Sequence, residues 1–196
     1  MGEVRALKSI HSGFFWGEVA PMDHMCQIYG SDMTFMDALE GFVGSGLRAG
    51  ESVIVIATAG HLHALEQRLR GAWLDLDRAR WEERYIALLA QETLGKFMVN
   101  GWPDEELFNK AVMDVVTRAR GPSKRPVRAF GEMVAVLWQH GHAAATVRLE
   151  HLWTKLQKRE QFPLFCAYPR AGFKGDADVS VRTICELHSR VIPSRV

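Results

Sequence analysis

The sequence has few cysteines, and none of them form a close pair. Its 196 residues include three cysteines, Cys26, Cys166 and Cys185, with no C-x-x-C arrangement. An odd number of cysteines without a signal peptide predicts free thiols rather than a disulfide framework, which is typical of the reducing cytoplasm. We therefore expect a cytoplasmic protein.

An excess of charge of either sign is also missing, and so is a long hydrophobic run. The formal net charge is +1, with 47% hydrophobic and 24% charged residues. This balance does not predict direct binding to nucleic acid. No apolar stretch is long enough to span a membrane or to act as a signal peptide. The composition predicts a soluble globular chain with no membrane association, long enough for one domain.

The motifs of nucleotide and ester chemistry are missing as well. The apolar run 53–57 leads into TAGHLHAL (residues 58–65), which holds one glycine and no lysine. A phosphate loop instead needs G-x-x-x-x-G-K-[ST], whose backbone amides and lysine hold the phosphates. Neither a G-x-S-x-G elbow nor a G-x-G-x-x-G fingerprint is present. These absences disfavour ordinary ATP hydrolysis and predict no enzyme class.

The histidines do not predict a metal site. Two close pairs occur, His61 with His63 and His140 with His142, but no thiolate lies near either pair in the sequence. Zinc sites usually combine thiolates and imidazoles at closer spacing, so we expect neither a metal nor another cofactor. His188 has two interpretations, a core histidine that donates to a backbone carbonyl or a site residue.

Strand and helix patterns alternate along the chain. The Val/Ile run at 53–57 is typical of a strand buried on both faces, and such strands belong to parallel sheets covered by helices. Right-handed crossovers then predict a three-layer α/β/α sandwich on a mainly parallel sheet. Residues 1–20 are predicted to form an extension, 21–190 one domain and 191–196 a tail. The expected strands are 53–57, 85–90, 127–130 and 162–168, and the expected helices are 31–50, 60–70, 103–120, 133–156 with a break at Gly141, and 178–189.

A carboxylate, Glu132, directly follows the expected strand 127–130. Open parallel sheets bind ligands beyond the carboxyl ends of their strands. A buried carboxylate is costly without a partner, so Glu132 is expected to bind the ligand or to pair with an Arg or His. We expect a mostly apolar pocket there, walled by Trp138 or Phe130. The other expected strand ends are Thr58, Gln91 or Glu92, and Tyr168.

Several short motifs, in their order and spacing, resemble the MEDS domain, a sensory domain named for methanogen and methylotroph regulators that include a dichloromethane-responsive repressor. The match covers about residues 20–190. The motifs are His24-Met-Cys-Gln-Ile-Tyr29, Gly46-Leu-x-x-Gly-Glu51, Arg128-x-Phe-Gly-Glu-Met133, Arg148-Leu-Glu150, Phe165-Cys-Ala-Tyr168 and His188.

The resemblance implies a RecA/KaiC-like core that has lost its phosphate loop, and a role in sensing small hydrocarbon derivatives beside a histidine kinase or a DNA-binding output domain. It adds His24 and Glu150 to the expected site, with Tyr29 and His188 from the same motifs. From its helical position alone, Glu150 is expected on a charged outer face. The chain leaves no room for an output domain, so we expect it to act through a separate partner.

These observations give three hypotheses. The first is a non-catalytic sensory module that binds a small organic ligand and signals to a histidine kinase or transcriptional regulator. The second is a divergent RecA/KaiC-like nucleotide-binding protein or ATPase. The third is an interaction domain whose former nucleotide cleft is filled by side chains. We also expect self-association, because Phe14, Phe15 and Trp16 form an apolar group without an assigned core partner.

Overall fold

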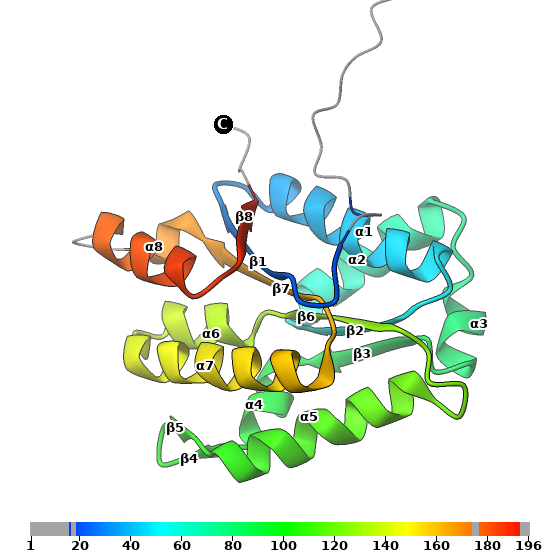
Figure 1. The fold of residues 1–196 in the computed structure, drawn as a ribbon. Coiled ribbons are helices and arrows are strands. Elements are labelled where there is room, and N and C mark those ends of the chain that lie inside the picture. Colours follow the sequence, from blue (N-terminus) through cyan, green and yellow to red (C-terminus); the bar gives the residue numbers. More distant parts are fainter. Residues whose placement is uncertain (1–15, 17–18, 174–176, 193–196) are drawn as a thin grey trace, which may run out of the picture.

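The protein is built on one six-stranded sheet in which every neighbouring pair is parallel. The computed structural model describes residues 16, 19–173 and 177–192. Helices cover both faces of the sheet, which gives the expected α/β/α sandwich (Figure 1). In spatial order the strands are β3 (Tyr85–Leu89), β2 (Ser52–Ala57), β6 (Val127–Gly131), β7 (Leu164–Pro169), β1 (His24–Tyr29) and β8 (Arg190–Ile192).

The helices divide between the two faces according to the direction of the strand connections. The chain runs from β1 to β2 and on to β3 toward one edge of the sheet, and then returns toward the other edge. Right-handed crossovers in opposite directions place their helices on opposite faces. One face carries α1 (Asp32–Arg48), α2 (Ala59–Gly71) and α3 (Leu76–Trp81); the other carries α4 (Ala90–Gly95), α5 (Glu105–Arg120), α6 (Met133–Gln139), α7 (Ala143–Glu160) and α8 (Ala177–Glu186).

Local sequence signals account for several element boundaries. The Ser31 side chain accepts a hydrogen bond from the Thr34 amide at 3.3 Å and begins α1, and Gly50 follows the end of that helix with φ +81°. Asp104 begins α5 by accepting from the Leu107 amide at 2.9 Å. These residues satisfy backbone groups that helix ends leave unpaired. The predicted break at Gly141 is also confirmed, since α6 ends at Gln139 and α7 begins at Ala143.

The four expected strands are present, but the sheet contains two more. We did not predict β1, β8 or the small antiparallel hairpin of β4 (Met98–Val99) and β5 (Trp102–Pro103). β8 includes residues 191 and 192 of the expected tail, and it pairs with β1 at the edge of the sheet. Most of the expected extension at 1–20, including Phe14 and Phe15, lies outside the described residues. Trp16 has core partners in its own chain, because its ring lies 5.5 Å from that of Phe42 and 5.4 Å from that of Phe165.

Three residues of the family-like motifs form a structural contact in the core. The Arg128 side chain on β6 is buried and pairs with Glu51, which lies just before β2. It also donates to the Phe42 carbonyl at 3.0 Å and to Ser45 Oγ at 2.9 Å. A Cβ on Gly46 would lie 2.6 Å from Arg128 Nε, so this helix position needs glycine. These motif residues therefore hold α1 against the sheet.

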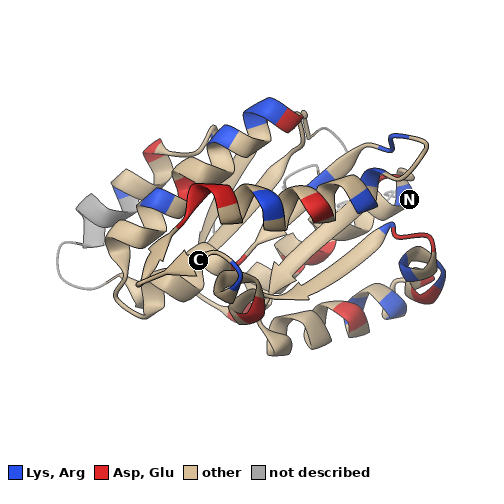
Figure 2. Cartoon of the chain, turned by 90° about the horizontal axis from the view of Figure 1, so that it is seen from below, with Lys and Arg blue, Asp and Glu red and all other residues tan. Residues whose placement is uncertain are grey.

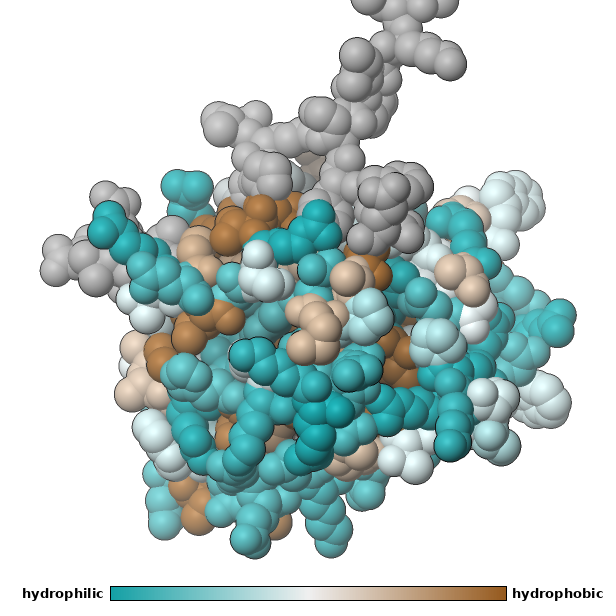
Figure 3. Space-filling view, in the orientation of Figure 1, coloured by the Kyte–Doolittle hydropathy of each residue, from teal (hydrophilic) through white to brown (hydrophobic). Residues whose placement is uncertain are grey.

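The outer surface is polar and carries both signs of charge. Lys and Arg alternate with Asp and Glu along the helices seen in Figure 2. The face in Figure 3 is mostly hydrophilic, with hydrophobic residues in small separate groups. Within the described part of the chain, none of the helices combines the length and the apolar character that crossing a membrane requires.

Candidate functional site

The residues predicted to mark one site at the strand ends lie in different places. Thr58 and Glu132 come together at the carboxyl ends of the neighbouring strands β2 and β6. Tyr168 on β7 instead packs among the core residues of the opposite face. Glu92 is exposed on α4, and no described hydrogen bond or ion pair joins it to the other three. The structure therefore brings Thr58 and Glu132 into contact, and it places Glu92 and the Tyr168 side chain elsewhere.

Glu132 lies where the connections after β2 and β6 diverge, the position at which open sheets bind ligands. Its carboxylate accepts a hydrogen bond from the Thr58 amide at 2.8 Å and lies 2.7 Å from His61 Nδ1. Both contacts are made within the chain, so the carboxylate has the histidine partner that we expected as one of two outcomes. The hydrogen bond to Glu132 raises the pKa of His61, and burial opposes this shift without cancelling it. Tyr29 lies close by and stacks on Phe35, whose ring meets the edge of His61.

A second group of polar side chains is buried on the opposite face, beneath α7 and α8. His24, Glu150, Cys166 and His188 place one ligand-type atom each within 4.8 Å of one another. His24 Nε2 lies 3.4 Å from Glu150 Oε2 and 3.6 Å from Cys166 Sγ. The thiol lies 3.8 Å from Glu150 Oε2, and His188 Nε2 lies 3.4 Å from Glu150 Oε1. We call these four residues the buried cluster.

Chain periodicity places the members of the buried cluster on one face. His24 and Cys26 are two residues apart on β1, and Cys166 and Tyr168 are two residues apart on β7. Residues two apart in a strand point to the same face, and here both pairs face α7 and α8. Glu150 on α7 has no exposed surface, so its expected place on a charged outer face is wrong. α7 buries a stripe that includes this carboxylate, namely Thr146, Leu149, Glu150, Trp153 and Gln157.

Burial and charge act against each other within the cluster. Burial raises the pKa of Glu150, but His188 and His24 outweigh it and hold that pKa well below its usual range. Burial lowers the pKa of His188, yet the neighbouring carboxylate raises it above its usual value. For His24, burial outweighs Glu150 and the pKa is lowered, while burial raises the pKa of the Cys166 thiol. Glu150 and His188 therefore shift each other's pKa in the directions that favour their charged forms.

His188 makes the contact expected of a core histidine, and its role as a site residue stays a prediction. Its Nδ1 lies 2.7 Å from the Ile184 carbonyl, the contact expected of a core histidine. Its Nε2 faces the cluster and has no hydrogen-bond partner among the described residues. Neither His61 nor Cys166 was expected to be a site residue. Cys166 lies two residues before Tyr168 in an expected strand, so strand alternation was the available signal.

A groove opens on the surface close to this cluster, at the carboxyl end of β7. Its volume is about 530 Å³, and its lining comes from the α6–α7 junction and the segment after β7, namely Trp138, Gln139, Gly141, Ala143, Pro169, Ala171 and Gly172. Trp138 Nε1 donates to the Gly172 carbonyl at 3.0 Å, which holds the two sides together. Trp138 lines this groove, but neither Glu132, beside which the pocket was expected, nor Phe130 is among the lining residues.

Tyr168 connects the groove to the buried cluster. Its ring meets the Trp138 ring edge-on at a centroid distance of 6.4 Å, and Phe173 lies against both rings. Its hydroxyl donates to Glu150 Oε1. Tyr168 therefore contacts both the wall of the groove and the buried carboxylate.

Comparison with known proteins agrees with the motifs. A search among curated proteins gives no match. A family model described as MEDS, the methanogen/methylotroph DcmR sensory domain, matches residues 23–189. This range contains the whole buried cluster, Tyr168 and the groove. Because the model covers most of the chain, the protein belongs to the MEDS family of sensory domains.

Proposed function

We propose that this chain is a non-catalytic sensory module that binds a small organic, hydrocarbon-derived ligand in the groove beside Trp138. It signals to a separate protein, a histidine kinase or a transcriptional regulator. The sensory character follows from the family. The observation that supports the site is the position of Tyr168, which contacts the groove wall with its ring and the buried Glu150 with its hydroxyl.

The groove suits a small and mainly apolar molecule. Its volume of about 530 Å³ is within the usual range for small-molecule sites, and the lining is rich in alanine, glycine, proline and one indole. The Trp138 N–H is already bonded to the Gly172 carbonyl, so among the described lining residues Gln139 is the one with a free polar side-chain group. Such a surface favours a ligand with a few carbon atoms and one polar group.

A path of direct contacts leads from the groove to α8. Tyr168 donates to Glu150, Glu150 pairs with His188, and His188 contacts the Ile184 carbonyl in the last turns of α8. The next residue, Ser189, donates from Oγ to the His24 carbonyl at 3.1 Å. In this proposal Tyr168 and α8 move together between two arrangements. A ligand that binds one arrangement more tightly than the other shifts the population toward it, and α8 changes position as a result.

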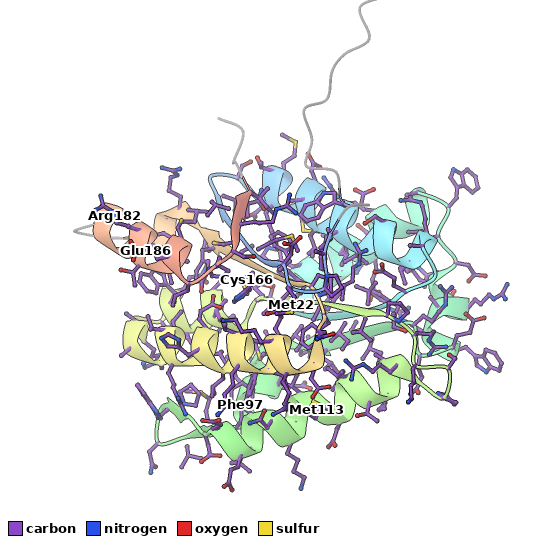
Figure 4. The ribbon with its side chains drawn as sticks, viewed as in Figure 1. Met22, Phe97, Met113, Cys166, Arg182 and Glu186 are labelled. Atoms are coloured by element: carbon purple, nitrogen blue, oxygen red, sulfur yellow. The ribbon has the colours of Figure 1, made fainter. Side chains whose placement is uncertain are left out.

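The outer face of α8 is the proposed output surface. Arg182 and Glu186 are exposed there, and Figure 4 shows both on the outside of the helix while Cys166 lies in the interior. Charged side chains on such a face give a partner specificity and register more than affinity.

The test begins with ligand identification. Mass spectrometry of small molecules released from the purified protein gives candidate ligands. Calorimetry then measures the binding of each candidate, and separately that of short-chain alcohols, amines and halogenated methanes. We expect Trp138→Ala to weaken binding at least about fivefold, since an aromatic wall contributes of order 1 kcal/mol or more.

Trp81→Ala is the matched control, because Trp81 is 85% exposed on α3 and belongs to the opposite face. This variant is expected to bind as the wild type does. Equal binding by the Trp138→Ala variant, with an unchanged circular dichroism spectrum, would contradict the proposed site.

A further inference from the structure

The geometry points to a metal site. We propose that His24, Glu150, Cys166 and His188 form a closed four-ligand site for a divalent transition metal, and that the donor set suits zinc. The proposal goes beyond the organic ligand and does not depend on the groove.

The distances among the four donor atoms fit tetrahedral coordination. Metal–ligand bonds of about 2.0–2.3 Å place the corners of a tetrahedron roughly 3.3–3.8 Å apart. The measured separations are 3.4 Å from His24 Nε2 to Glu150 Oε2, 3.6 Å from His24 Nε2 to Cys166 Sγ, and 3.8 Å from Cys166 Sγ to Glu150 Oε2. His188 Nε2 lies 3.4 Å from the second carboxylate oxygen. Three of the donors are therefore spaced as the ligands of one ion would be, and the four donor atoms all lie within 4.8 Å of one another.

Both imidazoles have an outer partner at the nitrogen that faces away from the cluster. His188 Nδ1 lies 2.7 Å from the Ile184 carbonyl, so in its neutral form it donates there and leaves the Nε2 lone pair free. His24 Nδ1 lies 3.2 Å from Thr154 Oγ1, which leaves its Nε2 toward the cluster. Metal-binding histidines are usually oriented in this way, by a carbonyl or similar group on the other ring nitrogen.

The carboxylate has an outer partner as well. Tyr168 donates to Glu150 Oε1 and so leaves Oε2, which lies nearest to His24 and Cys166, for the ion. One buried nitrogen is poorly satisfied, because His188 Nε2 makes no hydrogen bond within the described part of the chain and has only the ion-pair contact with Glu150 Oε1 at 3.4 Å, although its side chain has no exposed surface. Buried polar atoms are seldom left in this condition.

Charge and donor chemistry favour a divalent ion of intermediate softness. A Cys166 thiolate and the Glu150 carboxylate together carry two negative charges, which one divalent ion neutralises in a site closed to water. One thiolate, two imidazoles and one carboxylate are ligand types that zinc accepts in tetrahedral sites, whereas magnesium and calcium prefer oxygen ligands alone. All four side chains are buried, with no more than 8% exposed surface, so the site resembles structural rather than catalytic zinc sites.

The sequence separation explains why histidine spacing did not predict this set. Its members come from β1, α7, β7 and the residues after α8, and only the fold brings them together. The close pairs His61–His63 and His140–His142 contribute no ligand to it.

The test uses cobalt(II) as the probe on metal-free reduced protein. We expect one cobalt per chain, visible absorption typical of tetrahedral coordination, and a near-ultraviolet charge-transfer band from the thiolate. Zinc is expected to displace cobalt and abolish both signals. Tyr168→Phe removes only the outer hydrogen bond to Glu150 and is expected to weaken metal affinity roughly 10- to 100-fold.

Cys166→Ala is expected to abolish the charge-transfer band, and Cys26→Ala is the matched control. Cys26 is an equally buried thiol, paired in register with Cys166 on the neighbouring strand, but it is not one of the four ligands. If Cys166→Ala does not fold, His188→Gln provides the second variant and is expected to lose stoichiometric binding. The proposal is overturned if the wild-type protein binds no stoichiometric cobalt, or if the band survives in Cys166→Ala or disappears in Cys26→Ala.

Discussion

Two buried carboxylates, Glu132 and Glu150, each have histidine partners, one on either face of the sheet. Glu132 was identifiable from the sequence because it directly follows an apolar strand, and a carboxylate there needs a partner. Its actual partner, His61, is 71 positions away in the chain and could not be named in advance. Glu150 could not be identified as buried from α7 alone, because it lies next to the apolar stripe and a charged residue there usually faces solvent.

The His61–Glu132 pair predicts a pH-dependent contribution to stability. The hydrogen bond to Glu132, with further support from Asp32, raises the pKa of His61 above its ordinary value of 6.5 in the folded state. A raised folded pKa means that this stabilisation is fully present below about pH 6.5 and disappears as the pH rises through the folded pKa. We expect His61→Asn to lower the free energy of unfolding by about 1 kcal/mol at about pH 6 and by less at about pH 8.5.

Urea denaturation at both pH values measures this effect. His63→Asn is the control. His63 is exposed on the same helix, and its side chain hydrogen-bonds Gln67 rather than a carboxylate. A His61→Asn effect that is the same at both pH values, or larger at the higher one, would show that the pair does not act through the histidine charge.

At the scale of elements, strong local patterns were predictable and weak ones were not. The apolar runs of β2, β3, β6 and β7 identified those strands directly. β1 contains His24 and Gln27, both buried, so its sequence does not have the period of a strand with one polar face. β8 has only three residues and is a strand because it pairs with β1, so nothing in its own sequence identifies it.

The junction between α6 and α7 supports a prediction about the groove wall. Gly141 has φ +81°, a conformation that costs other residues about 1–2 kcal/mol, and a Cβ there would meet no atom within 4 Å. Gly141→Ala is therefore expected to lower the free energy of unfolding by about 1 kcal/mol through backbone strain alone.

Gly60→Ala is the matched control, because Gly60 lies in the first turn of α2 with open space around its Cα and without a positive φ. The same substitution is expected to raise the free energy of unfolding there by about 0.5 kcal/mol. Urea midpoints at equal m-values compare the two variants. Equal shifts in the same direction would contradict the assigned role of the Gly141 backbone.

For the molecule as a whole, the three layers could be predicted from the sequence. The distribution of the predicted site residues over the two faces of the sheet could not. Alternating strands and helices predict an α/β/α sandwich. The strand order could not be derived without β1 and β8, and the strand order decides which residues meet. Tyr168 lies near the end of β7 and Glu132 directly follows the adjacent strand β6, yet the Tyr168 side chain belongs to the α7–α8 face and that of Glu132 contacts the start of α2. The predicted site thus divides into two.

The diverging connections after β2 and β6 also predict how the protein responds to nucleotides. A RecA/KaiC-like ancestry stays a prediction, and a divergent ATPase was one alternative. Neither the loop Gly30-Ser31 that follows β1 nor the segment that follows β2 contains a lysine to neutralise phosphate charge. The Glu132 carboxylate already accepts a hydrogen bond from the amide of Thr58, the residue just before α2. A helix N-terminus would otherwise attract an anion there, and the charge of Glu132 would repel a phosphate. We therefore expect no shift in melting temperature with magnesium and ATP, and phosphate release equal to that of Glu132→Gln. Phosphate release by the wild type that exceeds that of the variant would restore the nucleotide hypothesis. It would show that Glu132 takes part in hydrolysis rather than in blocking phosphate binding at the start of α2.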